Sequence, residues 1–343
     1  MTGHTGFKGA WLALWLESMG AEVTGFSIDV PTSPSLFELA RVGESIESIT
    51  GDIRDRAAIG AAVAGARPEV VIHMAAQSLV RRSFAEPVAT YETNVMGTVN
   101  VLDAVRVEGR GVRAVVNVTS DKCYENREWV WGYREDEAMG GHDPYSSSKG
   151  CAELVAGAFG RSFFSDPDGT RLASARAGNV IGGGDWGEDR LIPDIMRAAV
   201  ADEAVRIRNP NSIRPWQHVL SPLSGYLVLA EALWASAELE RGWNFGPAEE
   251  DARPVGWIVE RLAELWPGEL RSEIDEGPHP HEARYLKLDS SRARARLGWR
   301  PLVGLDGALS SIVEWYGALR GHGDMREVTL GQIESLQYEH SSV

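Results

Sequence analysis

Short apolar runs and longer stretches of helical periodicity alternate along the first half of the chain. Residues 7–19 place their large apolar side chains on one face at helical spacing. The runs at 69–75 and 114–119 are apolar almost throughout, which is typical of parallel strands buried on both faces. Further strands are predicted at 22–29 and 46–49, and further helices at 55–65, 86–108 and 145–165. This alternation predicts an α/β fold, a Rossmann-type doubly wound parallel sheet.

The character of the chain changes after about residue 180, where a glycine-rich loop begins. Helices are predicted beyond it at 191–201 and 225–239, and strands at 171–177 and 243–245 are expected to return to the sheet. We therefore predict an NAD-binding Rossmann domain over 1–180 and a smaller C-terminal substrate-binding lobe over most of 181–343.

Composition narrows the classes of partner. The 343 residues carry a formal net charge of -15, which argues against nucleic acid or an anionic membrane as partner. Two cysteines, Cys123 and Cys151, are too few for a disulfide framework or a four-cysteine zinc site, which indicates a reduced, cytoplasmic setting. The apolar stretch 10–16 is too short to span a membrane and lacks the features of a signal peptide. The spacing of His, Cys and Asp predicts no metal site.

Gly3, Gly6 and Gly9 form a Gly-x-x-Gly-x-x-Gly turn at the start of the first helix, with Thr5 and Phe7 between them. Glycine lets the backbone bend tightly and approach a pyrophosphate closely. A helix N-terminus offers free N–H groups and the positive end of its dipole. The turn therefore predicts a dinucleotide-binding site.

A turn of this kind normally follows about five β-branched residues, which form the central strand of the sheet. Here only Met1 precedes the turn. We expect the true start to lie several residues upstream, within that strand, because a chain that begins at Met1 would lack the strand and fold poorly.

Tyr145 and Lys149 form a Tyr-x-x-x-Lys pair, whose members share one helix face. The lysine ammonium can lower the pKa of the tyrosine and reach the nicotinamide ribose. The phenolate then takes a proton from a sugar hydroxyl as hydride leaves the carbon. Alone, such a pair more often belongs to a solvated helix face, but after a glycine-rich turn and Thr119-Ser120 at the preceding strand end it predicts a catalytic pair.

Ser120, Asp121 and Lys122 follow the strand at 114–119, at the carboxyl end of the sheet where ligands bind in α/β folds. Ser120 can hydrogen-bond the substrate oxygen beside Tyr145. Asp121 and Lys122 are acid and base candidates in the same crevice. Considered alone, the tripeptide is more often a turn with a solvated ion pair.

Asp29, at a strand end, suits the ribose diol of adenosine and favours NAD over NADP. Further cofactor contacts are predicted from Asp52, Ile53, Ala75, Ala76 and Gln77.

In the second half the candidate substrate ligands are Arg190, Arg214 and His218. A buried Arg can hold a diphosphate with its fork of donors, whereas a lone His is more often structural. The sequence contains no Gly-x-Ser-x-Gly elbow and no P-loop.

Together these residues resemble the extended short-chain dehydrogenase/reductase family over essentially the whole chain, and within it the CDP-glucose 4,6-dehydratases. The resembling segments are TGHTGFKGAWLALWL (2–16), PTSPSLFE (31–38), TSDKCYENREWVWGYRE (119–135), DPYSSSKGCAELV (143–155), RAGNVIGGGDW (176–186), RPWQHVLSPLSGYL (214–227) and HEARYLKLDSSRARARLGW (281–299). Sugar-nucleotide dehydratases usually carry Thr-Asp-Glu where this chain has Ser120-Asp121-Lys122, and the CDP-glucose branch is similar to this chain in having Lys there.

The resemblance implies dehydration of CDP-glucose with NAD acting catalytically. Tyr145 would remove the C4 hydroxyl proton as hydride passes to NAD. Lys122, if neutral, would remove the C5 proton, and Asp121, if protonated, would donate to the departing C6 hydroxyl. A homodimer is also implied, with a four-helix interface from parts of 86–108 and 145–165. The resemblance adds Asn94 to the cofactor contacts and Arg176, Asn179 and Val180 to the sugar-nucleotide contacts, with Arg190 and Arg214 toward the diphosphate.

Two alternatives differ in the residues they need. A sugar-nucleotide 4-epimerase or decarboxylase shares Tyr145, Lys149 and the glycine turn but has no use for an acid/base pair at C5 and C6, so Asp121-Lys122 argues against it. A non-catalytic binding or redox-sensing protein of this fold often lacks the Tyr or the Lys, and both are present.

Overall fold

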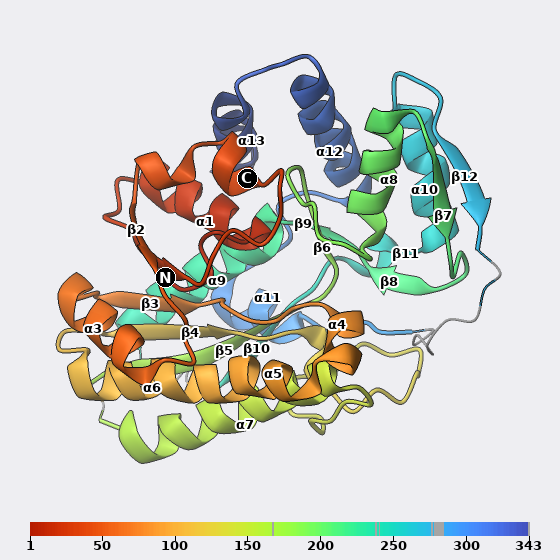
Figure 1. The fold of residues 1–343 in the computed structure, drawn as a ribbon. Helices are drawn as coiled ribbons and strands as arrows, with labels where there is room; N and C mark the ends of the chain where they lie inside the picture. Colours follow the sequence, from red (N-terminus) through yellow and green to blue (C-terminus); the bar gives the residue numbers. More distant parts are fainter. Residues whose placement is uncertain (167, 237–238, 240, 276, 278–284, 342–343) are drawn as a thin grey trace.

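The computed structural model describes residues 1–166, 168–236, 239, 241–275, 277 and 285–341, and its larger part is a parallel sheet with helices on both faces (Figure 1). The strands of this sheet are β1 (Thr24–Ser27), β2 (Glu47–Thr50), β3 (Val70–His73), β4 (Ala114–Val118), β5 (Arg171–Ala177) and β10 (Gly242–Phe245). Four of them pair in the order β10-β5-β4-β3, and β1 pairs with β2. The α/β class and the doubly wound parallel sheet expected from the sequence are confirmed.

Residues 1–3 lie between β1 and β3 and join the two parts of the sheet. Thr2 forms parallel bridges with Phe26 of β1 and with His73 of β3. The Thr2 N–H donates to Ile72 O at 3.0 Å, and the Gly3 N–H donates to Phe26 O at 2.9 Å. The position expected for a central strand is therefore filled, at its carboxyl end, by the residues that start the glycine turn.

Alternate residues of the central strands pack on opposite faces of the sheet, as the two-residue repeat of a strand requires. Val71, Val115 and Leu172 belong to one hydrophobic core, beneath α3 (Arg56–Ala66), α6 (Gly97–Glu108) and α7 (Pro144–Phe163). Their neighbours Ile72, Val116 and Ala173 belong to a second core, with α1 (Phe7–Ser18) and α9 (Leu220–Ala235).

Local sequence fixes where the helices that bear the site begin. The Asp143 side chain accepts the N–H of Ser146 at 2.9 Å and caps α7, whose first residue is Pro144. The helix predicted at 86–108 is one continuous helical stretch, made of α5 (Pro87–Tyr91), a π-helical segment (Glu92–Met96) and α6.

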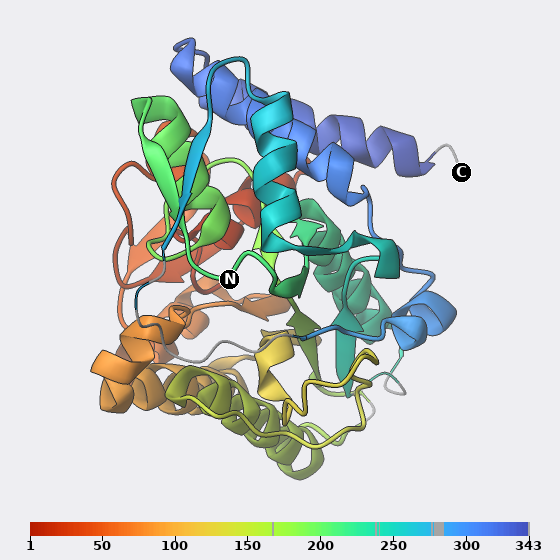
Figure 2. The same cartoon turned by 90° about the vertical axis from the view of Figure 1, so that its right-hand side faces the viewer.

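A smaller lobe stands beside one end of the sheet and contains most of the chain after β5 (Figure 1, Figure 2). Its helices include α8 (Leu191–Ala201), α10 (Val255–Leu265), α12 (Leu305–Arg320) and α13 (Met325–Ser341). Its paired strands are β6 (Val180–Ile181) with β9 (Gln217–His218), β7 (Ala204–Ile207) with β12 (Arg271–Ile274), and β8 (Ile213–Pro215) with β11 (Ala252–Pro254). Three short helices lie at other points of the chain: α2 (Leu36–Leu39), α4 (Val80–Ala85) and α11 (Ser291–Leu297). No helix among the described residues combines the length and apolarity needed to cross a bilayer.

Gly183 lies where this lobe meets the sheet domain. Its carbonyl accepts the indole N–H of Trp11 from α1 at 3.0 Å. A Cβ on Gly183 would lie 2.1 Å from Cγ of Trp315 on α12. Trp315 in turn makes an edge-to-face contact with Trp186, with ring centroids 5.5 Å apart. The absence of a side chain at Gly183 thus leaves room for the Trp315 ring, and the Gly183 carbonyl links the smaller lobe to Trp11 of the sheet domain.

Gly183→Ala should lower the free energy of unfolding by about 2 kcal/mol, because the added methyl overpacks a buried aromatic contact. Urea unfolding followed by tryptophan fluorescence measures this. Gly317→Ala on α12 is the matched control, since a Cβ there meets nothing within 4 Å, and it should stabilise by about 0.5 kcal/mol. Equal effects of the two substitutions would contradict the packing argument.

Candidate active site

Tyr145 and Lys149 lie one turn apart at the start of α7, and both side chains are buried. The Lys149 ammonium donates to Val118 O at the end of β4, at 3.4 Å. Burial raises the pKa of Tyr145 to about 12, opposed by a hydrogen bond with Ser120 and by the charge of Arg190. The expected lowering of the tyrosine pKa by Lys149 is therefore not what this structure shows, because burial of the phenol is the larger effect.

Burial also lowers the pKa of Lys149 to about 8, whereas the charge of Glu153 acts in the opposite direction. Glu153 lies one turn further along α7, and like Lys149 it is buried. The Lys149 amine can consequently gain or lose a proton near neutral pH.

Asp121 is a buried carboxyl group with one unpaired oxygen. Its Oδ1 accepts the hydroxyl of Ser120 at 2.9 Å, and its Oδ2 has no hydrogen-bond partner among the described residues. Burial raises the pKa of Asp121, against the opposing charges of Lys122 and Arg214. Lys122 is partly exposed, and its Nζ lies 6.0 Å from the ring centroid of Tyr145. The acid candidate is thus biased toward its protonated form and lies beside the tyrosine.

The glycine turn brings the N-terminus of α1 against the ends of β1 and β3. A Cβ on Gly9 would lie 1.9 Å from Gly3 O, and one on Gly3, which has φ +79°, would lie 2.8 Å from Ala75 N. The Gly6 N-cap gives α1 no side-chain cap, so the first N–H groups of the helix remain for a ligand. This geometry fits the diphosphate of a dinucleotide.

The other predicted cofactor residues follow the same strand ends. Thr5 donates its hydroxyl to Asp29 O at 2.5 Å, and the Asp29 side chain is exposed after β1. Asp52, after β2, forms an ion pair with Arg54 at 2.6 Å. Ile53 is buried beside it, where a Cβ on Gly97 of α6 would contact its Cδ1 at 2.5 Å.

Asn94 connects the end of β3 to the catalytic helix. Its Oδ1 accepts the Gln77 N–H at 2.8 Å, and its Nδ2 donates to the Ser148 hydroxyl at 2.8 Å. Ser148 itself donates to Tyr145 O at 2.7 Å. The π-helical segment that carries Asn94 therefore positions α7 relative to Gln77 and to Ala76 before it.

Two arginines of the second half reach the site. Arg190 pairs with Asp185 at 3.0 Å and donates to Ser78 Oγ at 2.9 Å, and its charge favours the phenolate of Tyr145. Arg214, on β8, lowers the pKa of Asp121 by its charge. The structure thus brings Arg190 and Arg214 to the Tyr145–Asp121 crevice.

The segment before β6 closes another side of the crevice. A Cβ on Gly178 would lie 3.0 Å from Asp121 Oδ2. Asn179 and Val180 follow, both partly exposed, and Asn179 O accepts the Gln217 N–H at 3.0 Å.

Arg176 departs from the expectation that it contacts the sugar nucleotide. It is 4% exposed, and its guanidinium pairs with Glu153 through Nε at 2.9 Å and a terminal nitrogen at 2.8 Å. Its other terminal nitrogen donates to Tyr124 Oη at 2.7 Å and to Glu135 O at 2.9 Å. The donors are used within the protein, so Arg176 is an internal structural residue here.

His218 is also enclosed. It is fully buried, its ring makes an edge-to-face contact with Trp11 at 5.9 Å, and burial lowers its pKa to about 4. The Leu220 N–H donates to its Nδ1 at 3.3 Å. A substrate contact from His218 remains a prediction that these contacts do not favour.

Sequence reasoning missed Lys8, Tyr226 and Glu153. Lys8 lies inside the glycine turn, where the prediction was based on the spacing of the glycines and not on the side chains between them. Its Nζ donates to Tyr226 Oη at 2.9 Å. Glu153 follows Lys149 by four residues, a helical spacing that could have signalled a partner for the lysine.

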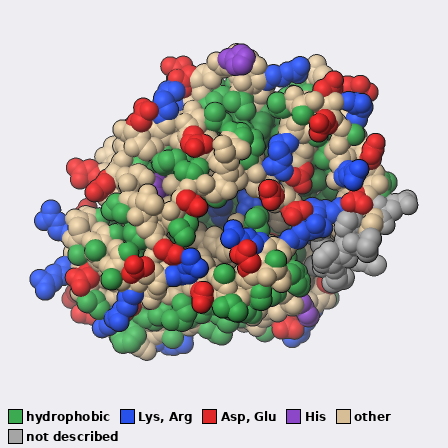
Figure 3. All heavy atoms as spheres, in the orientation of Figure 1, with side chains coloured by type: hydrophobic (Ala, Val, Ile, Leu, Met, Phe, Trp, Pro, Cys, Tyr) green, Lys and Arg blue, Asp and Glu red, His purple; other side chains and the backbone are tan. Residues whose placement is uncertain are grey.

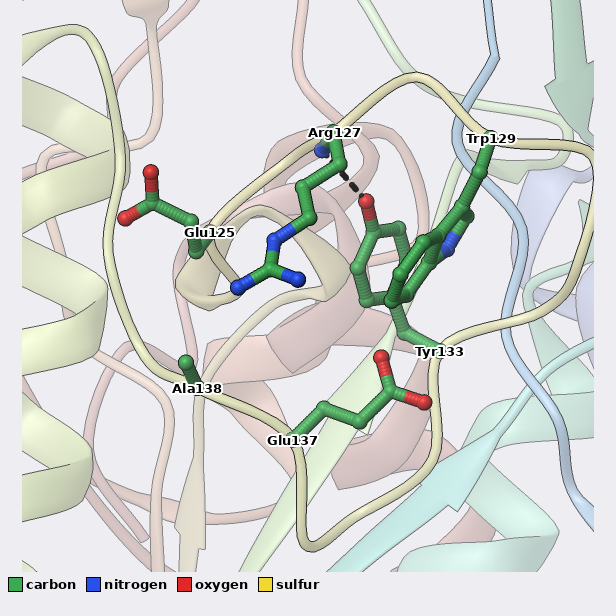
Figure 4. A pocket seen from close by; sticks show the side chains of 6 residues that line it. All are labelled: Glu125, Arg127, Trp129, Tyr133, Glu137 and Ala138. Atoms are coloured by element: carbon green, nitrogen blue, oxygen red, sulfur yellow. Dashed lines mark hydrogen bonds between the residues drawn. The ribbon is translucent and has the colours of Figure 1, made fainter.

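A separate pocket lies in the segment that follows Lys122 (Figure 4), with no part of the crevice in its lining. Tyr133 stacks on Trp129 there with ring centroids 5.2 Å apart, and its hydroxyl accepts the Arg127 N–H at 2.6 Å. The residues that line it are Glu125, Arg127, Trp129, Tyr133, Glu137 and Ala138.

Charge on the surface is mixed, with acidic side chains spread over the face seen in Figure 3. Within the described part of the chain, no group of three or more His, Cys, Asp or Glu could hold a metal ion. Both cysteines are free thiols, with Cys123 buried after Lys122 and Cys151 partly buried on α7.

Comparison with known proteins adds three findings. The family model described as GDP-mannose 4,6 dehydratase matches residues 1–236. A CDP-glucose 4,6-dehydratase of Salmonella typhimurium is 58% identical over 327 residues, which cover 94% of this chain and 91% of that protein. Two solved structures share the fold. A dTDP-glucose 4,6-dehydratase from Streptomyces venezuelae with NAD bound has a TM-score of 0.76 at 25% identity, over 95% of this chain and 98% of that one. A Thermus thermophilus UDP-glucose 4-epimerase with NAD has a TM-score of 0.79 at 23% identity, over 92% of this chain and 97% of that one.

Glu153→Gln should lower the free energy of unfolding by about 3 kcal/mol, because it leaves the Arg176 guanidinium buried without its counter-charge. Thermal and urea unfolding measure the loss. The matched control is Glu86→Gln, which breaks an exposed pair with Arg82 at 3.0 Å and should change stability by less than about 0.5 kcal/mol. A Glu153→Gln protein as stable as the control would show that the buried pair is not needed.

Proposed function

The chain belongs to the GDP-mannose 4,6 dehydratase family, and we propose that it is a CDP-glucose 4,6-dehydratase, which converts CDP-D-glucose to CDP-4-dehydro-6-deoxy-D-glucose and water. The observation that carries this function is 58% identity over 94% of the chain to a protein of that name. It is an NAD-dependent lyase, a hydro-lyase that acts on a nucleotide sugar.

The residues present fit NAD. The uncapped N-terminus of α1 and the close approach of Gly3 and Gly9 suit its diphosphate, and Lys149 suits the nicotinamide ribose. When bound, NAD would supply the acceptor for hydride from C4 of the sugar and the donor of that hydride to C6. The residues proposed to hold it are Gly3, Thr5, Gly6, Phe7, Gly9, Asp29, Asp52, Ile53, Ala75, Ala76, Gln77, Asn94, Tyr145 and Lys149.

In the first half of the reaction, Tyr145 removes the proton of the C4 hydroxyl. Burial opposes the phenolate, and the hydrogen bond with Ser120 and the charge of Arg190 favour it. Ser120 can also hydrogen-bond the same substrate oxygen. The resulting ketone makes the C5 proton acidic.

In the second half, Lys122 in its neutral form takes the C5 proton, and Asp121 donates a proton to the departing C6 hydroxyl. C5 regains a proton when C6 receives the hydride. The raised pKa of Asp121 and its unpaired Oδ2 suit a proton donor. An epimerase has no step that uses this acid, so the state of Asp121 favours the dehydratase over the epimerase.

A homodimer is proposed through α5, α6 and α7, with the neighbouring α4. Apolar side chains are exposed along these helices, among them Phe84, Val88, Met96, Leu154 and Phe163, of which Val88 is 69% and Leu154 64% exposed. Water-exposed apolar residues gathered on adjoining helices are typical of an interface. We also propose that the protein is cytoplasmic and that it acts in the synthesis of deoxysugars for lipopolysaccharide-type polymers.

Incubation with CDP-glucose and a trace of NAD should give a C6 methyl doublet in a proton NMR time course, with no net NADH, because the hydride returns to the same sugar. Formation of a C4 epimer would instead identify an epimerase. A methyl signal from dTDP- or GDP-glucose, with none from CDP-glucose, would keep the chemistry and overturn the nucleotide.

Asp121→Asn should retain C4 oxidation and slow the loss of water by about a hundredfold, since the acid is removed. Stopped-flow absorbance would then show NADH accumulating before product. Tyr145→Phe should give no NADH signal, and Asp306→Asn, the same change on an exposed carboxylate of α12, should behave as the unsubstituted protein. Unchanged turnover in Asp121→Asn would remove Asp121 from the acid role.

A further inference from the structure

We propose that Tyr124 is a positioning residue for the second half of the reaction, and that its hydroxyl group holds in place the turn that carries Asp121 and Lys122. The proposal deepens the proposed function and rests on it, because these two residues are the acid and the base of the elimination. Tyr124 is the second residue after Lys122, so any shift of its side chain reaches the turn through a short piece of backbone.

The acid and the base lie on a short 3-10 turn, Asp121–Cys123, that leaves the end of β4. The turn begins with a side-chain cap, because the Ser120 hydroxyl accepts the Lys122 N–H at 3.2 Å. Only one oxygen of the Asp121 carboxyl group has a partner among the described residues. The backbone of the turn therefore decides where this carboxyl group lies, and the far end of the turn needs an anchor as well.

The buried Tyr124 side chain supplies that anchor. Its hydroxyl donates to Asn244 Oδ1 of β10 at 2.7 Å and accepts from a terminal nitrogen of Arg176 on β5 at 2.7 Å. Asn244 Nδ2 donates to the carbonyls of Tyr133 at 2.7 Å and Asp289 at 3.1 Å, which turns the amide oxygen toward the hydroxyl. Burial raises the pKa of Tyr124, so the hydroxyl keeps the proton that it donates. Two strands of the sheet thus hold the end of the turn.

The ring of Tyr124 has contacts that do not depend on the hydroxyl. It stacks on Tyr133, with ring centroids 5.2 Å apart, and lies 5.1 Å from the guanidinium of Arg176. A phenylalanine would keep both contacts, and Arg176 would keep its two bonds to Glu153. A hydroxyl is costly to bury unless it is hydrogen-bonded, so packing alone gives no reason for a tyrosine here. The hydroxyl adds direction, because its two bonds fix the side chain against the sheet.

The first half of the reaction has anchors of its own. Asp143 caps α7, the helix of Tyr145 and Lys149. Asn94 donates to Ser148 of the same helix at 2.8 Å. The strand end that precedes the turn is paired with β5. Loss of the hydroxyl should therefore displace the acid and the base of the elimination more than the pair that oxidises C4.

Single turnovers of the full chain with NAD bound, and with protein in excess over CDP-glucose, test this in Tyr124→Phe. Stopped-flow absorbance of NADH reports C4 oxidation, and quenched samples report the C6 methyl product. We expect oxidation at the unsubstituted rate and product formation about tenfold slower, so that NADH accumulates. Tyr133→Phe is the matched control from the same hydrophobic cluster. It loses a bond to the Arg127 N–H (Figure 4), and both rates should stay unchanged.

Two further measurements separate positioning from a loss of stability. A single-turnover rate does not depend on how many molecules have folded, so partial unfolding cannot produce unequal rates. In the Asp121→Asn background, Tyr124→Phe should slow elimination by a smaller factor than in the unsubstituted protein, since part of its effect passes through Asp121. Asn244→Ser, which removes the acceptor and leaves the tyrosine, is the second variant and should also slow elimination more than oxidation.

Unchanged rates in Tyr124→Phe, or equal slowing of both halves, would overturn the proposal. So would the same inequality of rates in Tyr133→Phe, or an undiminished effect of Tyr124→Phe in the Asp121→Asn background. Failure of the proposed function is seen separately, as the absence of the methyl doublet from the unsubstituted protein. If that protein uses dTDP- or GDP-glucose instead, the same two rates are measured with that sugar nucleotide.

Discussion

Backbone hydrogen bonds from residues 1–3 hold the two parts of the parallel sheet together, and the active site is built around that junction. Thr2 bridges β1 and β3 at once. The same segment continues into the glycine turn, whose close contacts with Ala75 and with the start of α1 admit no side chain at Gly3 or Gly9. The strand ends that carry Asp29 and Ala75, and the helix that carries Lys8, are therefore placed by one set of backbone contacts.

Burial acts on the charged groups of the crevice with different results. Asp121 lacks a strong counter-charge, and its pKa is raised, whereas the amines of Lys149 and Lys8 have lowered pKa values. Glu153 and Arg176 are equally buried but form a two-bond ion pair. The fully paired Glu153 and Arg176 hold α7 against β5. Asp121 and Lys149, which lack such a partner, are available for proton transfer.

Much of this arrangement follows from the sequence. Strand 171–177 and helix 191–201 have the predicted bounds, because buried runs and amphipathic periodicity are local signals. Helix α9 starts at Leu220, five residues before its predicted start, since Pro222 falls in the first turn, where proline is tolerated. The paired short strands of the small lobe and helices α12 and α13 depend on tertiary contacts and were not predicted. Arg176 was assigned to the sugar nucleotide from the family resemblance, and only the position of Glu153 in space shows that its guanidinium is used within the protein.

The π-helical segment Glu92–Met96 has a consequence for the length of the chain. A π-helical turn holds one more residue than an α-helical turn, and this one presents Asn94 to Gln77 and Ser148. Loss of a single residue there would close the π-helical turn to a regular α-helical one. Val101 and Val105 of α6 would stay on the core side, but Asn94 would lose its place opposite Gln77 and Ser148. At this point the fold specifies a number of residues as strictly as it specifies their chemistry, because the extra residue brings the Asn94 amide to both partners.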